Sequence, residues 1–394
     1  MTWVSRGLAW LLEVGLHRRR PGRTPPFAAE GVRRILVVRK DNIGDVVCTT
    51  PALRALRHAF PGAHLAILVA EHCRAAVERN PDLNEVLTYT KAKHSSGLLG
   101  VPALWELSQI IRGLRRRRFD LAIAMGRPCS RSSAWLTYAS GAPWRVGYST
   151  SALHPFPFFL NLGCDPGAMT SHEVEGCLEL LASLGIPSAG RALTLVPDPE
   201  VQTAVRHRLT ELGAAPEAGL ALVHISTRRE SSRWPLPAFA LAADALHERL
   251  GLTVLLSWAP GDAKNPLFPG DDGKAEEVAR LMHTRPTLFR TPELAEMIAA
   301  VSLSDFVLSS DGGLMHIAAA LGIPQVALFG KGRVEHWAPV SEKSIALDRG
   351  GRADRISVGE AVAASVEVMS RWGRGKAFAA ARGTTGRRMA ARGE

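Results

Sequence analysis

The sequence contains no run of about 20 apolar residues, the length that an α-helix needs to cross a bilayer, so we expect no membrane-spanning helix. Cysteine is scarce, and its five residues are scattered without CxxC spacing. Such a set argues against a disulfide framework or a zinc site and favours a reducing, cytoplasmic compartment. The first 16 residues are too short to span a membrane and lack a small-residue cleavage site, which argues against a signal peptide.

The middle of the chain has no charge excess. Residues 1–34 hold seven Arg and two Glu, a net charge of +5, and residues 371–394 hold seven Lys or Arg and one Glu, a net charge of +6. These two ends account for the whole formal charge of +11, so residues 35–370 are formally neutral. Basic ends favour an anionic surface, either a membrane or nucleic acid. Because no recognition-helix, base-stacking or finger motif accompanies them, we expect an anionic membrane surface as partner and no nucleic acid.

Length and periodicity predict two α/β domains. A chain of 394 residues with 46% hydrophobic content exceeds one typical core. Apolar runs rich in Val, Ile, Leu and Ala alternate with helical patterns, which indicates parallel sheets covered by helices. We expect a basic, amphipathic segment (1–30), two Rossmann-like domains (31–192 and 193–370) and a basic tail that is disordered (371–394). The first segment is expected either to lie at a membrane interface or to pack on the protein's own surface.

The expected strands are short apolar runs. They cover residues 35–38, 65–70, 85–89 and 121–124 in the first domain, and residues 220–224, 253–257, 306–308 and 325–329 in the second. A loop over residues 39–45 is expected to lead from the first strand to a helix with Leu53, Leu56 and Phe60 on one face. A last helix is expected over residues 356–370.

The stretch from Ser310 to Gly330 is the most informative part of the sequence. Gly312 and Gly313 follow an apolar strand and precede a helical pattern. Glycine lets a ligand approach the backbone, and the helix directs free N–H groups and its positive dipole end at that ligand. His316, on the first helical turn, has an N–H donor for a phosphate oxygen. The pattern therefore predicts a phosphate-binding turn.

Short blocks along the chain resemble a known family. They are, in chain order, Ile35–Arg39, Ile43–Val46, Thr50–Leu56, Phe119–Ile123, Gly141–Tyr148, His172–Glu175, Asp311–His316 and Gln325–Gly330. Each block alone is short, but together they follow the order of the bacterial heptosyltransferase family, glycosyltransferase family 9, from about residue 33 to 340. The chain is thus identified by resemblance as a member of that family.

The resemblance implies a GT-B fold, in which two Rossmann-like domains with parallel sheets face each other across a cleft. It implies an acceptor site mainly on domain 31–192 and a nucleotide-sugar site on domain 193–370. The implied reaction moves a heptose, with inversion, from ADP-heptose to the inner core of a lipopolysaccharide, a lipid-linked acceptor. That acceptor implies a peripheral enzyme at the cytoplasmic face of the inner membrane. No Asp-x-Asp pair or histidine cluster lies at a strand end beside the phosphate-binding turn, so we expect neither a metal nor another cofactor.

Asp45 is the candidate catalytic residue. Inverting transfer needs a carboxylate that takes the proton from the acceptor hydroxyl while the anomeric carbon is attacked. By resemblance, Asp45 matches the aspartate of the family's Gly-Asp pair. Its alternative role is to cap the start of a helix, where a carboxylate satisfies free N–H groups.

The candidate donor site combines two segments. By resemblance, Ser226 and Thr227 match hydroxyl residues that bind phosphate. Asp311 is assigned to the hydroxyls of the donor sugar, because a carboxylate beside a diphosphate is repelled unless it faces the sugar; helix capping is its alternative role. The resemblance includes Gly312, Gly313 and His316 in the same site.

The sequence departs from the family pattern at two places. Ser232 stands where the family often has a basic residue, so Arg233 is assigned to supply the cation, with Arg228 and Arg229 as alternatives. The stretch Ser257-Trp-Ala-Pro-Gly stands where relatives usually have Gly-Gly-Pro-Gly, and residues 260–274 form an insertion beside it. Two alternatives therefore stay open: another nucleotide-sugar as donor, or a catalytically weak homologue that still binds a nucleotide-sugar.

Overall fold

The computed structural model describes residues 27–89, 101–127, 129–149, 159–165, 171–214, 219–262 and 270–373. The expectations for the basic ends therefore lie outside the described residues, apart from residues 27–30 and 371–373. In the described part of the chain, no helix is both long and apolar enough to cross a membrane.

The first domain is built on a parallel sheet of six strands in the order β3-β2-β1-β4-β5-β6. The central strand β1 pairs with β2 on one side and β4 on the other. Buried Val, Ile, Leu and Ala fill both faces of these central strands, as a sheet covered on both sides requires. The strands are β1 (Arg34–Arg39), β2 (His64–Ala70), β3 (Glu85–Tyr89), β4 (Leu121–Ala124), β5 (Trp144–Tyr148) and β6 (Leu162–Cys164).

The second domain repeats this topology. Its parallel sheet has the order β12-β11-β10-β7-β8-β9, which is the same arrangement when strands are counted from β7. The strands are β7 (Leu220–His224), β8 (Thr253–Trp258), β9 (Thr287–Arg290), β10 (Phe306–Ser310), β11 (Gln325–Phe329) and β12 (Ser344–Asp348). Two doubly wound parallel sheets confirm the predicted fold class.

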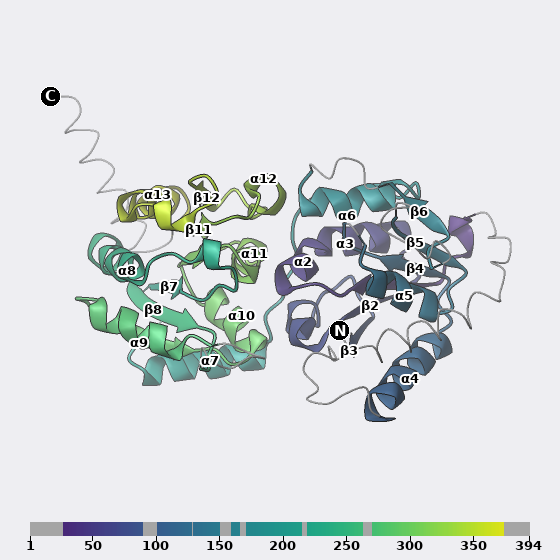
Figure 1. Ribbon diagram of the computed structural model, residues 1–394, viewed down its shortest axis with the longest axis horizontal. Helices are drawn as coiled ribbons and strands as arrows, with labels where there is room; N and C mark the ends of the chain where they lie inside the picture. Colours follow the sequence, from purple (N-terminus) through teal and green to yellow (C-terminus); the bar gives the residue numbers. More distant parts are fainter. Residues whose placement is uncertain are drawn as a thin grey trace, which may run out of the picture.

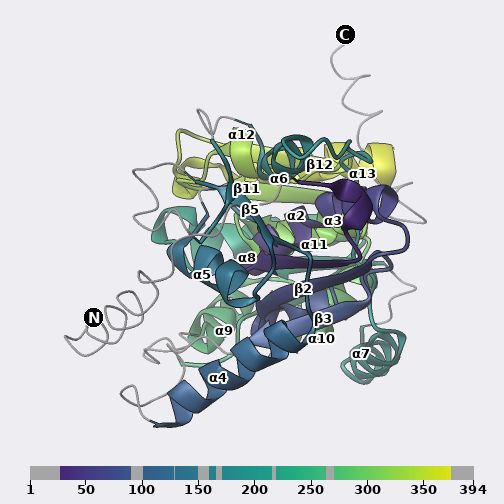
Figure 2. The same ribbon diagram turned by 90° about the vertical axis from the view of Figure 1, so that its right-hand side faces the viewer.

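Helices cover both faces of each sheet (Figures 1 and 2). In the first domain, α3 packs on α6 and α4 packs on α5. The helices are α2 (Ile43–Cys48), α3 (Thr50–Ala59), α4 (Val101–Arg116), α5 (Arg131–Ala139) and α6 (Glu173–Ala182), with the 3₁₀ helices η1 (Ala29–Gly31) and η2 (Glu71–Ala76).

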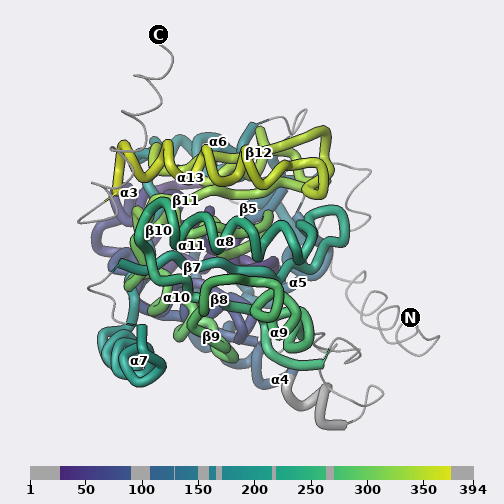
Figure 3. Tube along the Cα trace, turned by 90° about the vertical axis from the view of Figure 1, so that its left-hand side faces the viewer, coloured from purple at the N-terminus to yellow at the C-terminus, as the bar shows by residue number. Residues whose placement is uncertain are grey.

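In the second domain, α8, α9 and α13 lie on the outer face of the sheet (Figure 3). Helices α10 and α11 lie on the face toward the first domain (Figure 1). The helices are α7 (Pro199–Glu211), α8 (Leu236–Leu250), α9 (Asp272–Leu281), α10 (Leu294–Ser302), α11 (Gly313–Ala320), α12 (Val334–Trp337) and α13 (Val358–Trp372), with η5 (Glu230–Ser232) and η6 (Ala353–Arg355).

The two domains touch through their inner helices. α11 packs on α2, and α10 packs on η2. Apolar side chains of α10 and α11, among them Ile298, Val301 and Ile317, join the core of the first domain in one continuous cluster. The junction therefore includes an apolar contact that continues the core of the first domain.

Two sequence expectations need correction. The loop over residues 39–45 is shorter than expected, because α2 begins at Ile43 and places Asp45 inside its first turn. The short strands β5, β6, β9 and β12 were not predicted; each lies at or near a sheet edge and has partly exposed residues, so its apolar signal is weak. The expected last helix is present as α13.

Candidate active site

The strand order fixes where a ligand site can form. In a doubly wound sheet, the chain turns to opposite sides at the switch point, and ligands bind there at the carboxyl ends of the strands. The switch points lie between β1 and β4 in the first sheet and between β7 and β10 in the second. The segments that follow β1 and β10 are α2 and α11, which meet at the domain junction.

Asp45 occupies the third position of α2 and closes a capping box. Its Oδ2 accepts hydrogen bonds from the backbone N–H of Asn42 at 2.9 Å and from the Asn42 side-chain amide at 3.2 Å. Its Oδ1 accepts one from Arg39 Nη2 at 3.0 Å. Because a carboxylate oxygen has two lone pairs, Oδ1 keeps one free for a proton. Capping and catalysis can therefore coexist at this residue.

Arg39 is the largest fully buried side chain at this site. At the end of β1 it is 1% exposed and forms ion pairs with three carboxylates: Asp41 at 3.3 Å, Asp45 at 3.0 Å and Glu173 at 2.6 Å. The same nitrogen, Nη2, donates to both Asp45 and Glu173. A guanidinium suits this position because its planar fork carries several fixed donors. Arg39 thus determines where the Asp45 carboxylate lies.

Glu173, the first residue of α6, connects Arg39 to the second domain. Its Oε2 lies 3.1 Å from His336 Nε2, on α12. Burial would raise the pKa of Glu173, but the charges of Arg39 and His336 and their hydrogen bonds hold it at about 2. The sequence analysis missed Arg39, Glu173 and His336 as site residues. A signal existed only for the first two, which lie in the family-like blocks Ile35–Arg39 and His172–Glu175.

His316 lies where α11 meets α2. It is 2% exposed, and its Nδ1 is 3.4 Å from the Cys48 thiol. Burial lowers its pKa to about 4, so the ring is neutral at pH 7. Gly44 makes this contact possible, since a Cβ on Gly44 would lie 2.6 Å from His316 Cδ2. The assignment of His316 to a donor phosphate stays a prediction; here its ring packs against the helix that carries Asp45.

Gly313 has a matching role from the other side. A Cβ on Gly313 would lie 3.1 Å from Ile43 Cβ, whereas one on Gly312 would have only the Ser310 carbonyl within 4 Å, at 3.8 Å. Gly313 therefore permits the close approach of α11 and α2. Gly312 leaves the backbone before α11 open, as the predicted phosphate contact requires.

Gly44→Ala is expected to lower stability by about 1–3 kcal/mol, the usual cost of overpacking a tight contact. The new Cβ meets the buried His316 ring, so the domain junction must shift. Gly273→Ala is the matched control, because Gly273 also lies in a helix and a Cβ there has no atom within 4 Å. Thermal unfolding of both variants measures the difference. Adding His316→Ala to Gly44→Ala should restore much of the loss; if it does not, the contact is misassigned.

Asp311 follows β10 and faces the loop after β7. Its side chain is 7% exposed and lies 3.3 Å from Arg229 Nη1. Burial raises the pKa of Asp311, and Arg229 opposes that shift. The N-cap of α11 is Gly312, so Asp311 does not cap this helix through its side chain. Thr227 Oγ1 donates to the Asp311 backbone carbonyl at 3.4 Å, which joins the two predicted donor segments.

The remaining donor candidates are spread over the same loop. Ser226 Oγ accepts a hydrogen bond from the Ala259 backbone N–H at 2.9 Å, so it also orders the turn after β8. Arg228 Nη1 donates to the Asn42 side chain at 3.4 Å, across the domain junction. Arg233 has an exposed side chain without an ion pair among the described residues. Of the three arginines, Arg229 is held beside Asp311, Arg228 lies at the junction, and Arg233 faces solvent.

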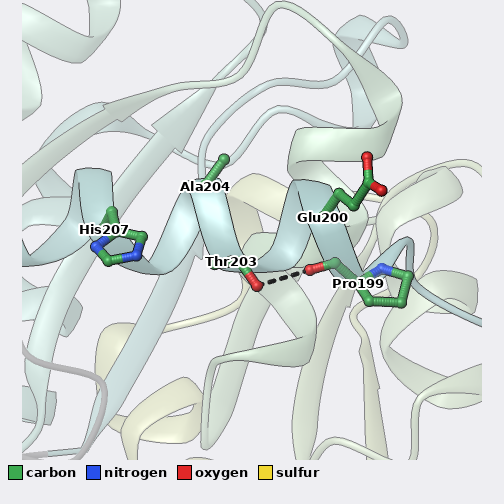
Figure 4. A pocket seen from close by; sticks show the side chains of 5 residues that line it. All are labelled: Pro199, Glu200, Thr203, Ala204 and His207. Carbon is green, nitrogen blue, oxygen red and sulfur yellow. Dashed lines mark hydrogen bonds between the residues drawn. The ribbon is translucent and has the colours of Figure 1, made fainter.

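A surface hollow of the described residues lies elsewhere. It is lined by Pro199, Glu200, Thr203, Ala204 and His207, all on one helix, α7 (Figure 4). α7 packs on α10 at the edge of the second domain, away from α2 and α11 (Figure 1). Its shallow lining holds one carboxylate and no group paired with it, so we assign it no chemistry. Among the described residues, no group of three or more His, Cys, Asp or Glu side chains is placed to hold a metal ion.

The sequence pattern of glycosyltransferase family 9 (heptosyltransferase) matches residues 107–355, more than half of the chain. The chain belongs to this family. It is therefore a glycosyltransferase. The match spans both domains and includes Glu173, Ser226, Thr227, Asp311 and His316.

Curated relatives of this glycosyltransferase carry related names. Lipopolysaccharide heptosyltransferase 2 of Escherichia coli K12 is 23% identical over 329 residues, which cover 79% of this chain and 86% of the relative. Lipopolysaccharide heptosyltransferase 1 of Pseudomonas aeruginosa is 26% identical over 301 residues, which cover 75% and 78%.

Solved structures share the fold of this glycosyltransferase. The glycosyl transferase family 9 protein of Veillonella parvula superposes with a TM-score of 0.73 at 22% identity, over 85% of this chain and 97% of that one. The E. coli heptosyltransferase WaaC with ADP-2-deoxy-2-fluoro heptose superposes with a TM-score of 0.62 at 22% identity, over 83% and 97%.

Proposed function

We propose that this glycosyltransferase moves a heptose, with inversion and without a metal, from ADP-heptose to the inner core of a lipopolysaccharide acceptor. The observation that carries the proposal is the contact of α2 with α11. It brings the helix that carries Asp45 in the first domain next to the glycine turn that follows Asp311 in the second. The names of the curated relatives, and the solved relative that holds an ADP-heptose analogue, support this donor and acceptor.

In this proposal Asp45 is the general base. Its Oδ1 takes the proton from the acceptor hydroxyl, since Oδ2 already has two donors from Asn42. The hydroxyl oxygen then bonds to the anomeric carbon, and the bond from that carbon to the diphosphate oxygen breaks. Arg39, fixed by Glu173, keeps Oδ1 in position during this step.

The donor binds to the second domain. The free N–H groups at the start of α11 and the hydroxyls of Ser226 and Thr227 bind the diphosphate. Arg229 and Arg233 supply the positive charge that the leaving diphosphate needs, because guanidinium groups bind phosphate oxygens in pairs. Asp311 accepts hydrogen bonds from the sugar hydroxyls, with Arg229 balancing its buried charge.

One observation favours an alternative donor. The turn after β8 is where the sequence departs from the family pattern. In this turn the backbone N–H of Ala259 donates a hydrogen bond to the Ser226 hydroxyl. This turn therefore lies beside a predicted phosphate ligand, and a changed turn can change the nucleotide-sugar that fits. A catalytically weak homologue that only binds the nucleotide-sugar is the remaining alternative.

A panel of nucleotide-sugars separates these functions. Thermal unfolding is measured with ADP-, UDP- and GDP-linked sugars, ADP-heptose among them, and turnover is measured with a short soluble core acceptor. A ligand at 100 times its Kd stabilises the folded state by about 2.7 kcal/mol. We expect ADP-heptose to give the largest shift and to support transfer. A larger shift together with turnover for another nucleotide-sugar would identify that sugar as the donor. A shift without turnover would establish the catalytically weak homologue that only binds a nucleotide-sugar.

The arginines of the β7 loop test the donor site separately. Arg229→Ala and Arg233→Ala are each expected to weaken ADP-heptose binding by roughly 1.5–3 kcal/mol, the value of a hydrogen bond to a charged group. Arg228→Ala is the comparison, because its described contact is with Asn42 of the first domain. Calorimetric titration gives the three affinities. A loss confined to Arg228→Ala would move the cation to the domain junction and reject both assignments.

The proposal places the enzyme at the cytoplasmic face of the inner membrane. The charge at residues 1–34 and 371–394 supports this placement, because each basic residue near an anionic surface contributes about 1 kcal/mol. A variant limited to residues 31–370 should lose salt-sensitive binding to anionic vesicles and keep activity on a soluble acceptor. Vesicle binding as strong as that of the full chain would exclude the ends as the anchor.

A further inference from the structure

The start of α6 is held from three directions. Arg39, at the end of β1, donates to Glu173. Arg127, after β4, donates to the backbone carbonyl and the hydroxyl of Ser171, each at 2.9 Å. From the second domain, His336 reaches both Ser171 and Glu173. The start of α6 is thus tied to the end of β1, to the segment after β4 and to the second domain.

The contacts of His336 determine its protonation. Nδ1 lies 2.8 Å from the Ser171 carbonyl oxygen, and Nε2 lies 3.1 Å from Glu173 Oε2. A backbone carbonyl only accepts hydrogen bonds, and so does an ionised carboxylate. Both ring nitrogens must therefore donate, which requires the doubly protonated, positively charged ring. His172 behaves differently: its Nδ1 accepts from the Val174 N–H and its Nε2 donates to the Ala338 carbonyl, as in a neutral ring.

His336 and Arg39 each contact a different oxygen of the Glu173 carboxylate. His336 takes Oε2 and Arg39 Nη2 takes Oε1, while the second hydrogen of that same Nη2 goes to Asp45. If His336 withdraws, both carboxylate oxygens become free for Arg39. The Glu173 carboxylate then attracts the guanidinium away from Asp45 more strongly than it does while His336 contacts it.

We propose that Glu173 is a positioning residue for the transfer, which holds Arg39 on the Asp45 carboxylate only while charged His336 of the second domain completes the arrangement. This inference rests on the proposed function, in which Asp45 is the base. It makes the position of the Asp45 carboxylate depend on the contact between the domains. The carboxylate is correctly placed when the second domain contacts the first.

The other histidines near this arrangement are buried. The ring of Trp337 lies near both His336 and His316, with centroid distances of 4.8 Å and 6.2 Å. The pKa values of His172 and His316 are both lowered, chiefly by burial.

His336→Gln tests the inference, because glutamine keeps one hydrogen bond and removes the charge. We expect kcat to fall about tenfold, the size of a coupling between residues in one charge network, with the donor KM within about twofold. In a Glu173→Gln background, His336→Gln should have no further effect on kcat.

His172→Asn is the matched control. Asparagine preserves the N-cap of α6. It is too short to keep the hydrogen bond to Ala338, so the variant loses a contact between the domains that involves no charged group. We expect it to leave kcat near the wild-type value. An equal loss of kcat in His172→Asn and His336→Gln, or additive effects of the His336 and Glu173 changes, would overturn the inference.

A second readout does not depend on turnover. In thermal unfolding, His336→Gln and Glu173→Gln should each lower the melting temperature, and their effects should not add, because both remove the contact between Glu173 and His336. Additive losses would overturn the inference even if no donor supports transfer. Full activity of Asp45→Asn would instead reject the proposed base and leave this coupling as measured.

Discussion

Asp45→Asn is expected to lower the transfer rate by about 10²–10⁴-fold, the usual span for loss of a general base. Asparagine is nearly the same size and can still occupy the first turn of α2, but its amide does not take a proton at neutral pH. The proposed donor site lies on the other domain, so the affinity for ADP-heptose should stay nearly unchanged. Single-turnover kinetics with a soluble acceptor and a separate donor titration measure the two quantities.

Asp41→Asn is the control for this experiment. Asp41 also forms an ion pair with Arg39, at 3.3 Å, but it is more exposed and does not belong to the capping box of α2. Its loss should reduce the rate far less than the loss of Asp45. Equal reductions would mean that Asp45 acts through the charge of Arg39, and a parallel loss of donor affinity would favour capping as its main role.

Acid should destabilise the first domain through Glu173. The pKa of Glu173 is about 2 in the folded protein and about 4.5 ordinarily, so its ionised form favours the folded state. This stability is fully present above about pH 4.5 and is lost as the pH falls toward 2. A difference of this size corresponds to roughly 3 kcal/mol. Urea unfolding of the wild type and Glu173→Gln across this range should show the two curves converging in acid.

Glu78→Gln shows what an exposed carboxylate contributes. Glu78 pairs with Arg74, four residues earlier in the chain, and both side chains are nearly half exposed. Such surface pairs contribute about 0.2–1 kcal/mol. If Glu173→Gln is no more destabilised than Glu78→Gln at neutral pH, the buried pair with Arg39 does not stabilise the fold.

The sequence predicted the parts of the fold that local pattern determines. The central strands are continuous apolar runs, and four of the eight expected strands have the predicted bounds. The edge strands β9 and β12 lack such runs, because one side of each is only partly covered. The positions of Asp45 and Asp311 after β1 and β10 were also predictable, since strand ends and glycine turns are visible in the sequence.

The contacts between the domains were not predictable from local pattern. Glu173 is 134 residues from Arg39 and 163 residues from His336, and only the folded chain brings the three together. The environment of His316 depends in the same way on Gly44, which lies in the other domain. A histidine beside glycines on a first helical turn has the same sequence pattern whether it faces a ligand or a neighbouring helix.

The apolar cluster that runs through both domains has a consequence for how the chain unfolds. Ile298, Val301 and Ile317 of the second domain are buried against the first, so separation of the halves exposes them to water. Two such halves produced as separate polypeptides would each carry an uncovered apolar face and tend to aggregate. We therefore expect one cooperative unfolding transition for the whole chain. When ligands enter and leave, we expect the domains to rotate against each other without separating.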